Sequence, residues 1–464
     1  MSWIEKLYRT YDNNSACIGQ KDKAPLLPLC HDIQNAHIEI AIDGKGNFLR
    51  AYIVEKTDTP TIIPVTEDSM TRRTGSKPVG HPLCDKLQYI AGDFTKFGGE
   101  VTSGYAKKPQ EPHEAYLKQL SDWCASPHKH TKVFAVHEYV RRGQVIADLV
   151  RIGILPVDSE GRLIKARSGT TKKDAQGIFR VIPAGSKPEE AFVRWMVEIA
   201  GDPESRLWRD PSIWKSWADF NATLESKNGL CYVEGQIEPL ASKHPKKIRH
   251  RADGAKLISS NDEEGYTFLG RFTSADEACG VGFEVTQKAH NALRWLIDRQ
   301  GFVEYVKDGH TTKASLAVVA WAVSGAKIPD PFADTLSLLF GAGDNSTEIQ
   351  AGYTAQEIGT QLAKKIAGYS AKLGATDDVV VLALDSATPG RMAIRYYREL
   401  TGSEFLDRVI SWHDINNGCT WQQRLGKDRV FVGVPAPRDI AEAAYGRRLD
   451  CILSAPLRQL RDGR

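Results

Sequence analysis

The chain has 464 residues, of which 41% are hydrophobic and 26% charged, and its formal net charge at pH 7 is +3. This length exceeds what one hydrophobic core holds, so we expect several folded domains, and the composition excludes a disordered or histone-like protein. Because the net charge is small, any nucleic-acid binding must come from local clusters of basic residues.

The sequence also argues against disulfide bonds, export and membrane insertion. Its eight cysteines are scattered without a CxxC pair, which is typical of reduced thiols in a cytosolic protein. The N-terminus lacks the basic and apolar regions of a signal peptide, and no stretch reaches the roughly 18 apolar residues of a membrane-spanning helix. We therefore expect a soluble, intracellular protein without membrane contact.

Residues 1–155 predict an N-terminal α+β region. An amphipathic helix opens it, and alternating apolar residues on both sides of a Gly/Asp/Asn turn predict a β-hairpin over 38–54. The basic loop 71–80 follows. Further along, periodicity predicts a helix over 110–124, and we interpret the apolar stretches 132–140 and 144–157 as two strands.

Residues 156–230 begin with a stretch rich in glycine, serine, threonine and cations, which predicts an exposed excursion. We interpret 189–201 as helical. The next segment carries Trp208, Trp214 and Trp217 at helical spacing, so these rings are expected to be packing anchors.

Residues 231–345 form the next predicted region, with a strand, a basic segment and a helix over 282–301. The C-terminal region, 346–464, predicts a helix, a hairpin over 379–400 and a final helix. The fold class expected for the whole chain is multidomain α+β, with antiparallel hairpins and mixed sheets packed against helices and no Rossmann or P-loop core.

Sequence motifs for enzymatic chemistry are absent. The chain has no Walker A loop, no GxSxG elbow and no HExxH pair. The adjacent His413 and Asp414 keep an HD-type metal-dependent nuclease open as an alternative, although His413 lies on the apolar stripe of its helix. We therefore predict a non-enzymatic protein with no catalytic residue, no metal and no cofactor.

Three clusters of basic and hydroxyl residues are candidates for nucleic-acid contacts. The first comprises Arg72, Arg73, Thr74, Ser76 and Lys77. The second comprises Lys243, Lys246, Lys247, Arg249 and Arg251, followed by Lys256, Ser259, Ser260 and Asn261. The third comprises Arg162, Lys165, Arg167, Lys172 and Lys173. Such side chains can neutralise phosphates and reach base edges, but any one cluster could also be a solvated face.

The order of motifs resembles the large subunit of the type I-C CRISPR surveillance complex (Cascade). The similar segments are HIEIAIDGKGNFL, TRRTGSKPVGHPLCDKLQYIAG, IEPLASKHPKKIRHRADGAKLISSNDEEGYTFLGR and VVVLALDSATPGRMAIRYYREL. They follow one another in the family's order over nearly the whole chain. Two features depart from the family pattern: the first loop has Gly75 before Ser76, and the family's C-terminal helical bundle is not recognisable.

The resemblance implies a non-catalytic DNA-binding and RNA-binding subunit in antiviral defence. Members recognise the protospacer-adjacent motif in double-stranded DNA, start unwinding for R-loop formation, lie near the 5′ handle of the CRISPR RNA and help recruit a helicase-nuclease. Implied partners are the backbone, handle-processing and small subunits. We expect the first cluster and Lys256, Ser259, Ser260 and Asn261 to contact the motif DNA, and the other basic residues to contact nucleic-acid backbone. A scaffold that binds only RNA is a further alternative.

Overall fold

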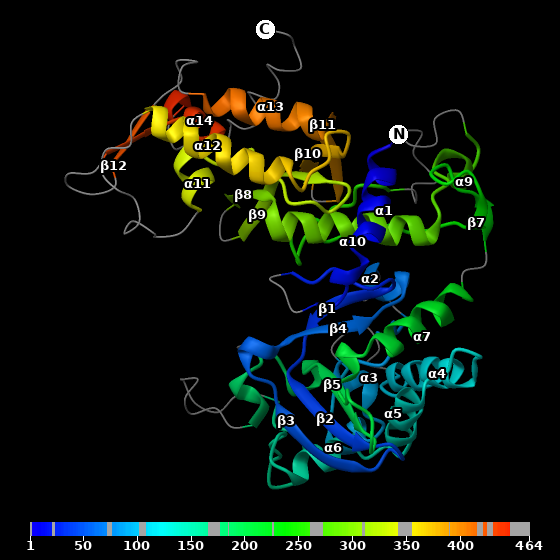
Figure 1. Cartoon of the computed structure of the whole chain (residues 1–464). Coiled ribbons are helices and arrows are strands. Elements are labelled where there is room, and N and C mark those ends of the chain that lie inside the picture. Colours follow the sequence, from blue (N-terminus) through cyan, green and yellow to red (C-terminus); the bar gives the residue numbers. More distant parts are fainter. Residues whose placement is uncertain are drawn as a thin grey trace. The chain divides into compact units, whose positions relative to one another are not determined.

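The structure is a computed structural model, and it confirms a multidomain α+β chain (Figure 1). It describes residues 2–20, 24–71, 77–101, 108–165, 177–183, 185–224, 227–259, 272–308, 311–341, 355–388, 390–414, 421–424 and 430–445. The chain divides into two compact units. Unit 1 comprises Met1–Leu26 and Leu230–Arg464, and unit 2 comprises Leu27–Gly229.

A three-stranded sheet of order β3-β2-β5 lies in unit 2. β2 (Ile38–Asp43) and β3 (Phe48–Ile53) form the predicted hairpin, and β5 (Val193–Glu198) pairs with β2 in parallel. The helix predicted over 189–201 is therefore wrong. Short apolar runs do not separate a buried strand from a buried helix, and here Trp195 and its neighbours are buried in the sheet.

The helices of unit 2 include one that was predicted and two that were not. α4 (Glu111–Ala125) confirms the prediction over 110–124. The two predicted strands are instead the helices α5 (Thr131–Arg141) and α6 (Val145–Arg151). The side chain of His130 caps α5 by accepting a hydrogen bond from Lys132 N, 3.2 Å away, and the buried residues of α5 recur at helical spacing.

The tryptophans of the second predicted region are packing anchors, as expected. Trp208, Trp214 and Trp217 are 4%, 7% and 0% exposed. Trp217, on α7 (Pro211–Ala222), donates its indole N–H to the carbonyl of Val65 at 3.1 Å. The remaining strands and α-helices of unit 2 are β1 (His31–Asn35), β4 (Pro60–Pro64), α2 (Glu67–Thr71) and α3 (Leu87–Ile90).

Unit 1 is built around a four-stranded antiparallel sheet of order β11-β10-β9-β8. The strands are β8 (Phe302–Asp308), β9 (Thr311–Ala322), β10 (Asp378–Thr388) and β11 (Arg391–Thr401). β10 and β11 confirm the hairpin predicted over 379–400. The helix predicted over 282–301 is α10 (Phe283–Gln300), and α1 (Trp3–Asn13) packs against it.

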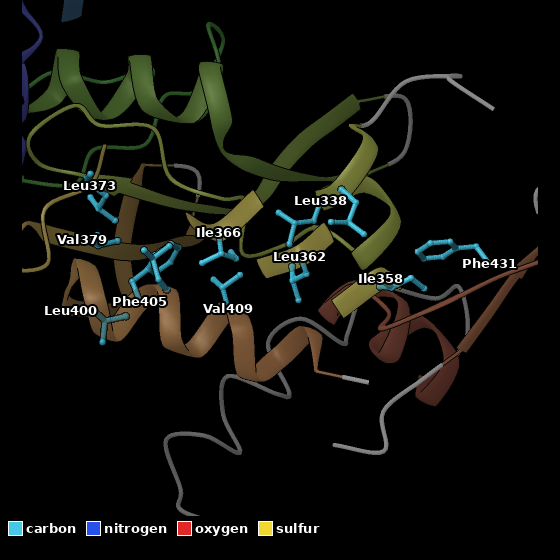
Figure 2. Packing of buried hydrophobic residues seen from close by; sticks show 13 residues of the cluster. Leu338, Ile358, Leu362, Ile366, Leu373, Val379, Leu400, Phe405, Val409 and Phe431 are labelled. Atoms are coloured by element: carbon cyan, nitrogen blue, oxygen red, sulfur yellow. The ribbon is translucent and has the colours of Figure 1, made fainter. Parts of the chain in front are cut away.

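A hydrophobic core joins this sheet to the C-terminal helices (Figure 2). Leu362 and Ile366 come from α12 (Ala355–Ser370), while Phe405 and Val409 come from α13 (Gly402–His413). A capping box at Thr401 and Glu404 begins α13. Both helices were predicted, α13 from its apolar stripe.

Smaller elements complete unit 1. They are β6 (Asn228–Leu230), β7 (Ile237–Pro239), α9 (Ala275–Ala278), α11 (Thr335–Phe340), β12 (Trp421–Arg424), β13 (Val430–Gly433) and α14 (Pro437–Tyr445). The cysteines in the described ranges are free thiols, as predicted: Cys17, Cys30, Cys84, Cys124, Cys231 and Cys279. No helix in these ranges is long and apolar enough to cross a membrane.

Candidate nucleic-acid interface

The second basic cluster lies on an ordered loop that packs on α10. Ile248 and Ala255 are 1% and 0% exposed, and His244 is buried with its Nδ1 2.8 Å from the hydroxyl of Thr286 on α10. The loop is thus anchored by apolar and polar contacts. This anchoring gives the basic side chains between these residues a defined position.

Arg249 and Asp253 form a buried ion pair inside this loop. Both side chains are 4% exposed, and the Nε of Arg249 lies 2.8 Å from the Oδ2 of Asp253. Oδ1 of Asp253 also accepts hydrogen bonds from Arg249 Nη2 and from the N–H of Ala255. Burial alone would raise the pKa of Asp253, but the hydrogen bonds from Arg249 and Ala255 hold it below its ordinary value.

A hydrogen bond to the backbone carbonyl of Asp253 stabilises a sharp turn of the loop at Lys247. This carbonyl accepts the N–H of Lys247 at 2.9 Å, and Lys247 has a φ of 66°, which is unusual for a residue other than glycine. The loop backbone therefore turns sharply at a lysine that is itself partly exposed. Arg249, buried in its ion pair, holds this turn and does not lie on the surface.

The remaining predicted residues of the cluster that the structure describes are exposed or partly exposed. Arg251 is exposed, and the partly exposed residues are Lys243, Lys246, Lys247, Lys256 and Ser259. Ser260 and Asn261 lie outside the described residues. The described cluster thus presents several cations on one short, anchored segment.

Lys256 extends the cluster onto the sheet of unit 1. Its N–H donates to the carbonyl of Gly390 at 3.2 Å, and its carbonyl accepts the N–H of Met392 at 2.9 Å. This parallel bridge pairs Lys256 with Arg391, and Arg391 and Arg395 are both exposed on β11. The Nε of Arg395 also lies 3.2 Å from Oδ2 of Asp385.

Arg391 and Arg395 were not among the predicted site residues. Their alternation on one strand is visible in the sequence, but their position beside Lys256 is not. The pairing joins residues 256 and 391, which are 135 positions apart in the chain, so a local sequence pattern does not predict it.

Two buried histidines, His244 in the loop and His290 on α10, lie next to each other where the loop packs on the helix. Burial, together with the neighbouring His290 and Lys256, lowers the pKa of His244 to about 3. Burial likewise lowers the pKa of His290 to about 4. His244 and His290 are therefore neutral at pH 7 and add no positive charge to this region.

The first cluster lies in unit 2 and is described only at its end. Arg72, Arg73, Thr74 and Ser76 lie outside the described residues, whereas Lys77 is exposed. The chain that follows Lys77 is fixed by the carboxylate of Asp85, which is fully buried. This carboxylate accepts the N–H of His81 at 2.6 Å and that of Lys86 at 2.7 Å.

The third cluster contains two described cations, and both already contact carboxylates. Arg162 lies 2.7 Å from Glu160 and 3.4 Å from Asp158. Lys165 pairs with Glu100. Arg167, Lys172 and Lys173 lie outside the described residues. A phosphate would therefore have to compete with these carboxylates for Arg162 and Lys165.

The histidine considered for metal chemistry is buried in the core. His413 is 2% exposed, and its Nδ1 lies 3.0 Å from the hydroxyl of Thr335. Burial lowers its pKa to about 4. Within the described ranges, no three His, Cys, Asp or Glu side chains are grouped so that they could hold a metal ion.

Comparison with known protein families agrees with the motif order. The family model described as CRISPR-associated protein (Cas_Csd1) matches residues 7–460, which is nearly the whole chain. A comparison with curated protein sequences gives no significant match. The family match covers both structural units, including the anchored basic loop and β11. This chain therefore belongs to the Csd1 family of CRISPR-associated proteins.

Proposed function

We propose that this protein is the non-catalytic large subunit of a type I-C CRISPR RNA-guided surveillance complex. In this role it recognises the protospacer-adjacent motif in double-stranded DNA and starts the unwinding that leads to an R-loop. It contacts the 5′ handle of the CRISPR RNA, assembles with the backbone, handle-processing and small subunits, and helps recruit the helicase-nuclease. Membership of the Csd1 family and the motif order support this proposal.

The observation that carries the DNA-binding part is the anchored loop, which carries Lys247 and on which Lys256 pairs with Arg391. Guide RNA pairing reads most of a target, so the protein needs only a short, fixed set of contacts to the motif duplex. Cations on a flexible segment lose conformational entropy when they bind, whereas the buried Arg249–Asp253 pair fixes this loop before DNA arrives.

For the described residues, the exposure of each side chain suggests which contact it makes with DNA. Lys246, Lys247, Arg251, Lys256 and Arg391 contact phosphate, since lysine and arginine neutralise the backbone and fix register. Arg249 positions the loop. Ser259, with the adjacent Ser260 and Asn261, and the first cluster from Arg72 to Lys77 are the candidates for reading base edges.

A salt titration of the assembled complex tests these contacts. We expect Lys256→Ala and Arg391→Ala each to weaken binding to a guide-matched duplex and to reduce the slope of log K against log salt by about 0.9 per lost phosphate contact. Lys364→Ala, on the exposed face of α12, removes the same charge elsewhere in unit 1 and should change neither. Equal behaviour of all three variants would refute the assignment.

The two alternatives make different predictions. An HD-type nuclease would cleave DNA or RNA when a divalent metal is added, and would lose cleavage in His413→Ala. A scaffold that binds only RNA would bind CRISPR RNA normally and show no dependence on the sequence flanking a target. The proposed subunit shows no cleavage of its own and a strong dependence on that flank.

A further inference from the structure

A cavity of about 350 Å³ lies in unit 1, apart from the anchored loop. Its walls come from the end of α10, from α1, from the end of β9 and from the segment after β9. The lining residues that matter here are Trp295, Arg299, Gln300, Lys327, Asp330 and Phe332. The volume is at the lower end of the range of about 300–1,000 Å³ that is typical of small-molecule pockets, which limits the occupant to a single compact group.

Arg299 gives this cavity a cationic group beside an aromatic ring. Its guanidinium carbon lies 4.8 Å from the ring centroid of Trp295, and Trp295 is fixed by burial at 4% exposure. Arg299 itself is exposed. A guanidinium is planar, and planar nucleic-acid bases stack on such groups.

The charges of the lining favour an anion. In the part of the chain that the structure describes, neither Arg299 nor Lys327 takes part in an ion pair. Of the charged side chains on the lining, Arg299 and Lys327 are cations and Asp330 is the carboxylate. The amide nitrogen of Gln300 donates to the carbonyl of Ala320, which fixes the Gln300 side chain at the wall.

The rest of the wall is mixed: Thr10 and Asn14 are polar, whereas the segment after β9 adds apolar and conformationally restricted residues. Pro329 and Pro331 restrict the backbone of the segment after β9, and Phe332 adds a second aromatic side chain. A planar ring with an attached phosphate matches this combination of aromatic side chains, an exposed guanidinium and a lysine that has no ion-pair partner among the described residues. A purely aliphatic group would leave both cations without a partner.

We propose that this cavity receives one base of a single-stranded nucleic acid, stacked on Arg299, with an adjacent phosphate at Lys327. The inference rests on the proposed function only in that single-stranded nucleic acid reaches the protein. A free nucleotide has the same chemistry, and the test below separates it from a strand.

The test compares two fluorescently labelled 12-nucleotide strands with the full-length chain, one complete and one with abasic sites. We expect the wild type to bind the complete strand at least about fivefold more tightly, because stacking of one base is worth about 1–3 kcal/mol. Arg299→Lys keeps the charge and loses the planar group, so it should abolish that preference. Lys327→Ala should weaken binding of both strands and reduce the salt slope by about 0.7.

Matched controls are Arg408→Lys on the exposed face of α13 and Lys364→Ala on α12, and both should behave as wild type. Thermal unfolding of each variant checks that it is folded. A wild-type preference retained in folded Arg299→Lys would overturn the proposal, as would displacement of the strand by adenosine monophosphate at concentrations near the strand's own Kd. No motif duplex is used, so a failure of motif recognition would leave this result unaffected.

Discussion

Removing the charge of Asp253 tests whether the buried ion pair organises the basic loop. Asp253→Asn removes the carboxylate charge that faces the guanidinium of Arg249, whose side chain is 4% exposed. Breaking one side of a buried ion pair typically destabilises a protein by about 3–5 kcal/mol. We expect that loss in urea unfolding, together with faster hydrogen exchange at Ala255, whose N–H donates to Asp253 at 3.0 Å.

A control of the same sequence spacing is available on α14. Arg438 and Glu442 also lie four residues apart, but their side chains are 55% and 31% exposed. Glu442→Gln should therefore change the free energy of unfolding by less than about 1 kcal/mol. If Asp253→Asn is no more destabilising than Glu442→Gln, the pair is not buried as described and the reasoning is refuted.

A double variant separates a positioning role of Arg249 from a direct phosphate contact. Arg249→Met combined with Asp253→Leu replaces the pair by apolar side chains, a change that is often neutral or stabilising. If Arg249 only positions the loop, the double variant should bind duplex DNA more tightly than either Arg249→Met or Asp253→Asn. If it is as stable as wild type yet binds as weakly as Arg249→Met, Arg249 itself contacts the phosphate.

Two further predictions concern stability. The lowered pKa values of His244 and His290, about 3 and 4, mean that the unfolded chain takes up protons first as pH falls. The free energy of unfolding should therefore decrease from pH 6.5 to about pH 4, by up to about 1.4 kcal/mol per pH unit for each histidine, and a flat profile in urea unfolding would contradict this. Gly46 and Gly161 both have a φ of 75°, but a Cβ at Gly46 would lie 2.6 Å from the carbonyl oxygen of Ala135, whereas Gly161 has no neighbour within 4 Å. Thermal unfolding should show Gly46→Ala to be more destabilising than Gly161→Ala by about 1–3 kcal/mol, and equal effects would show that the hairpin turn does not pack on α5.

Periodic segments of the fold could be predicted from the sequence. The hairpins β2–β3 and β10–β11 alternate around turn residues, and α10, α12 and α13 have clear apolar stripes. These patterns arise from the local geometry of helices and strands, so they can be recognised in a single sequence.

The errors occurred where apolar residues are dense. β5 is a short buried strand whose residues lack alternation, and it was interpreted as a helix. α5 contains Val133, Phe134 and Val136, residue types enriched in strands, and its N-cap is the less usual His130. Tertiary packing decided both cases, and a local pattern does not contain that information.

The candidate site could be predicted as a set of cations but not as an arrangement. The sequence does not show that Arg249 turns inward to Asp253 while Lys247 stays partly exposed, because both belong to the same basic run. It also does not show that Arg391 lies beside Lys256. Charge clusters are readable in a sequence, whereas burial and long-range pairing depend on the fold.

The most direct test of the central claim is a selection for the sequence beside the target. The CRISPR RNA complex would be assembled with wild-type protein, with Lys77→Ala, with Asn261→Ala or without this subunit, and offered guide-matched duplexes with a randomised short flank. The proposed function predicts strong enrichment of one flank by the wild-type complex, and loss of that enrichment without the subunit or with either variant. Equal binding of all flanks by a stable wild-type complex would contradict motif recognition by this protein.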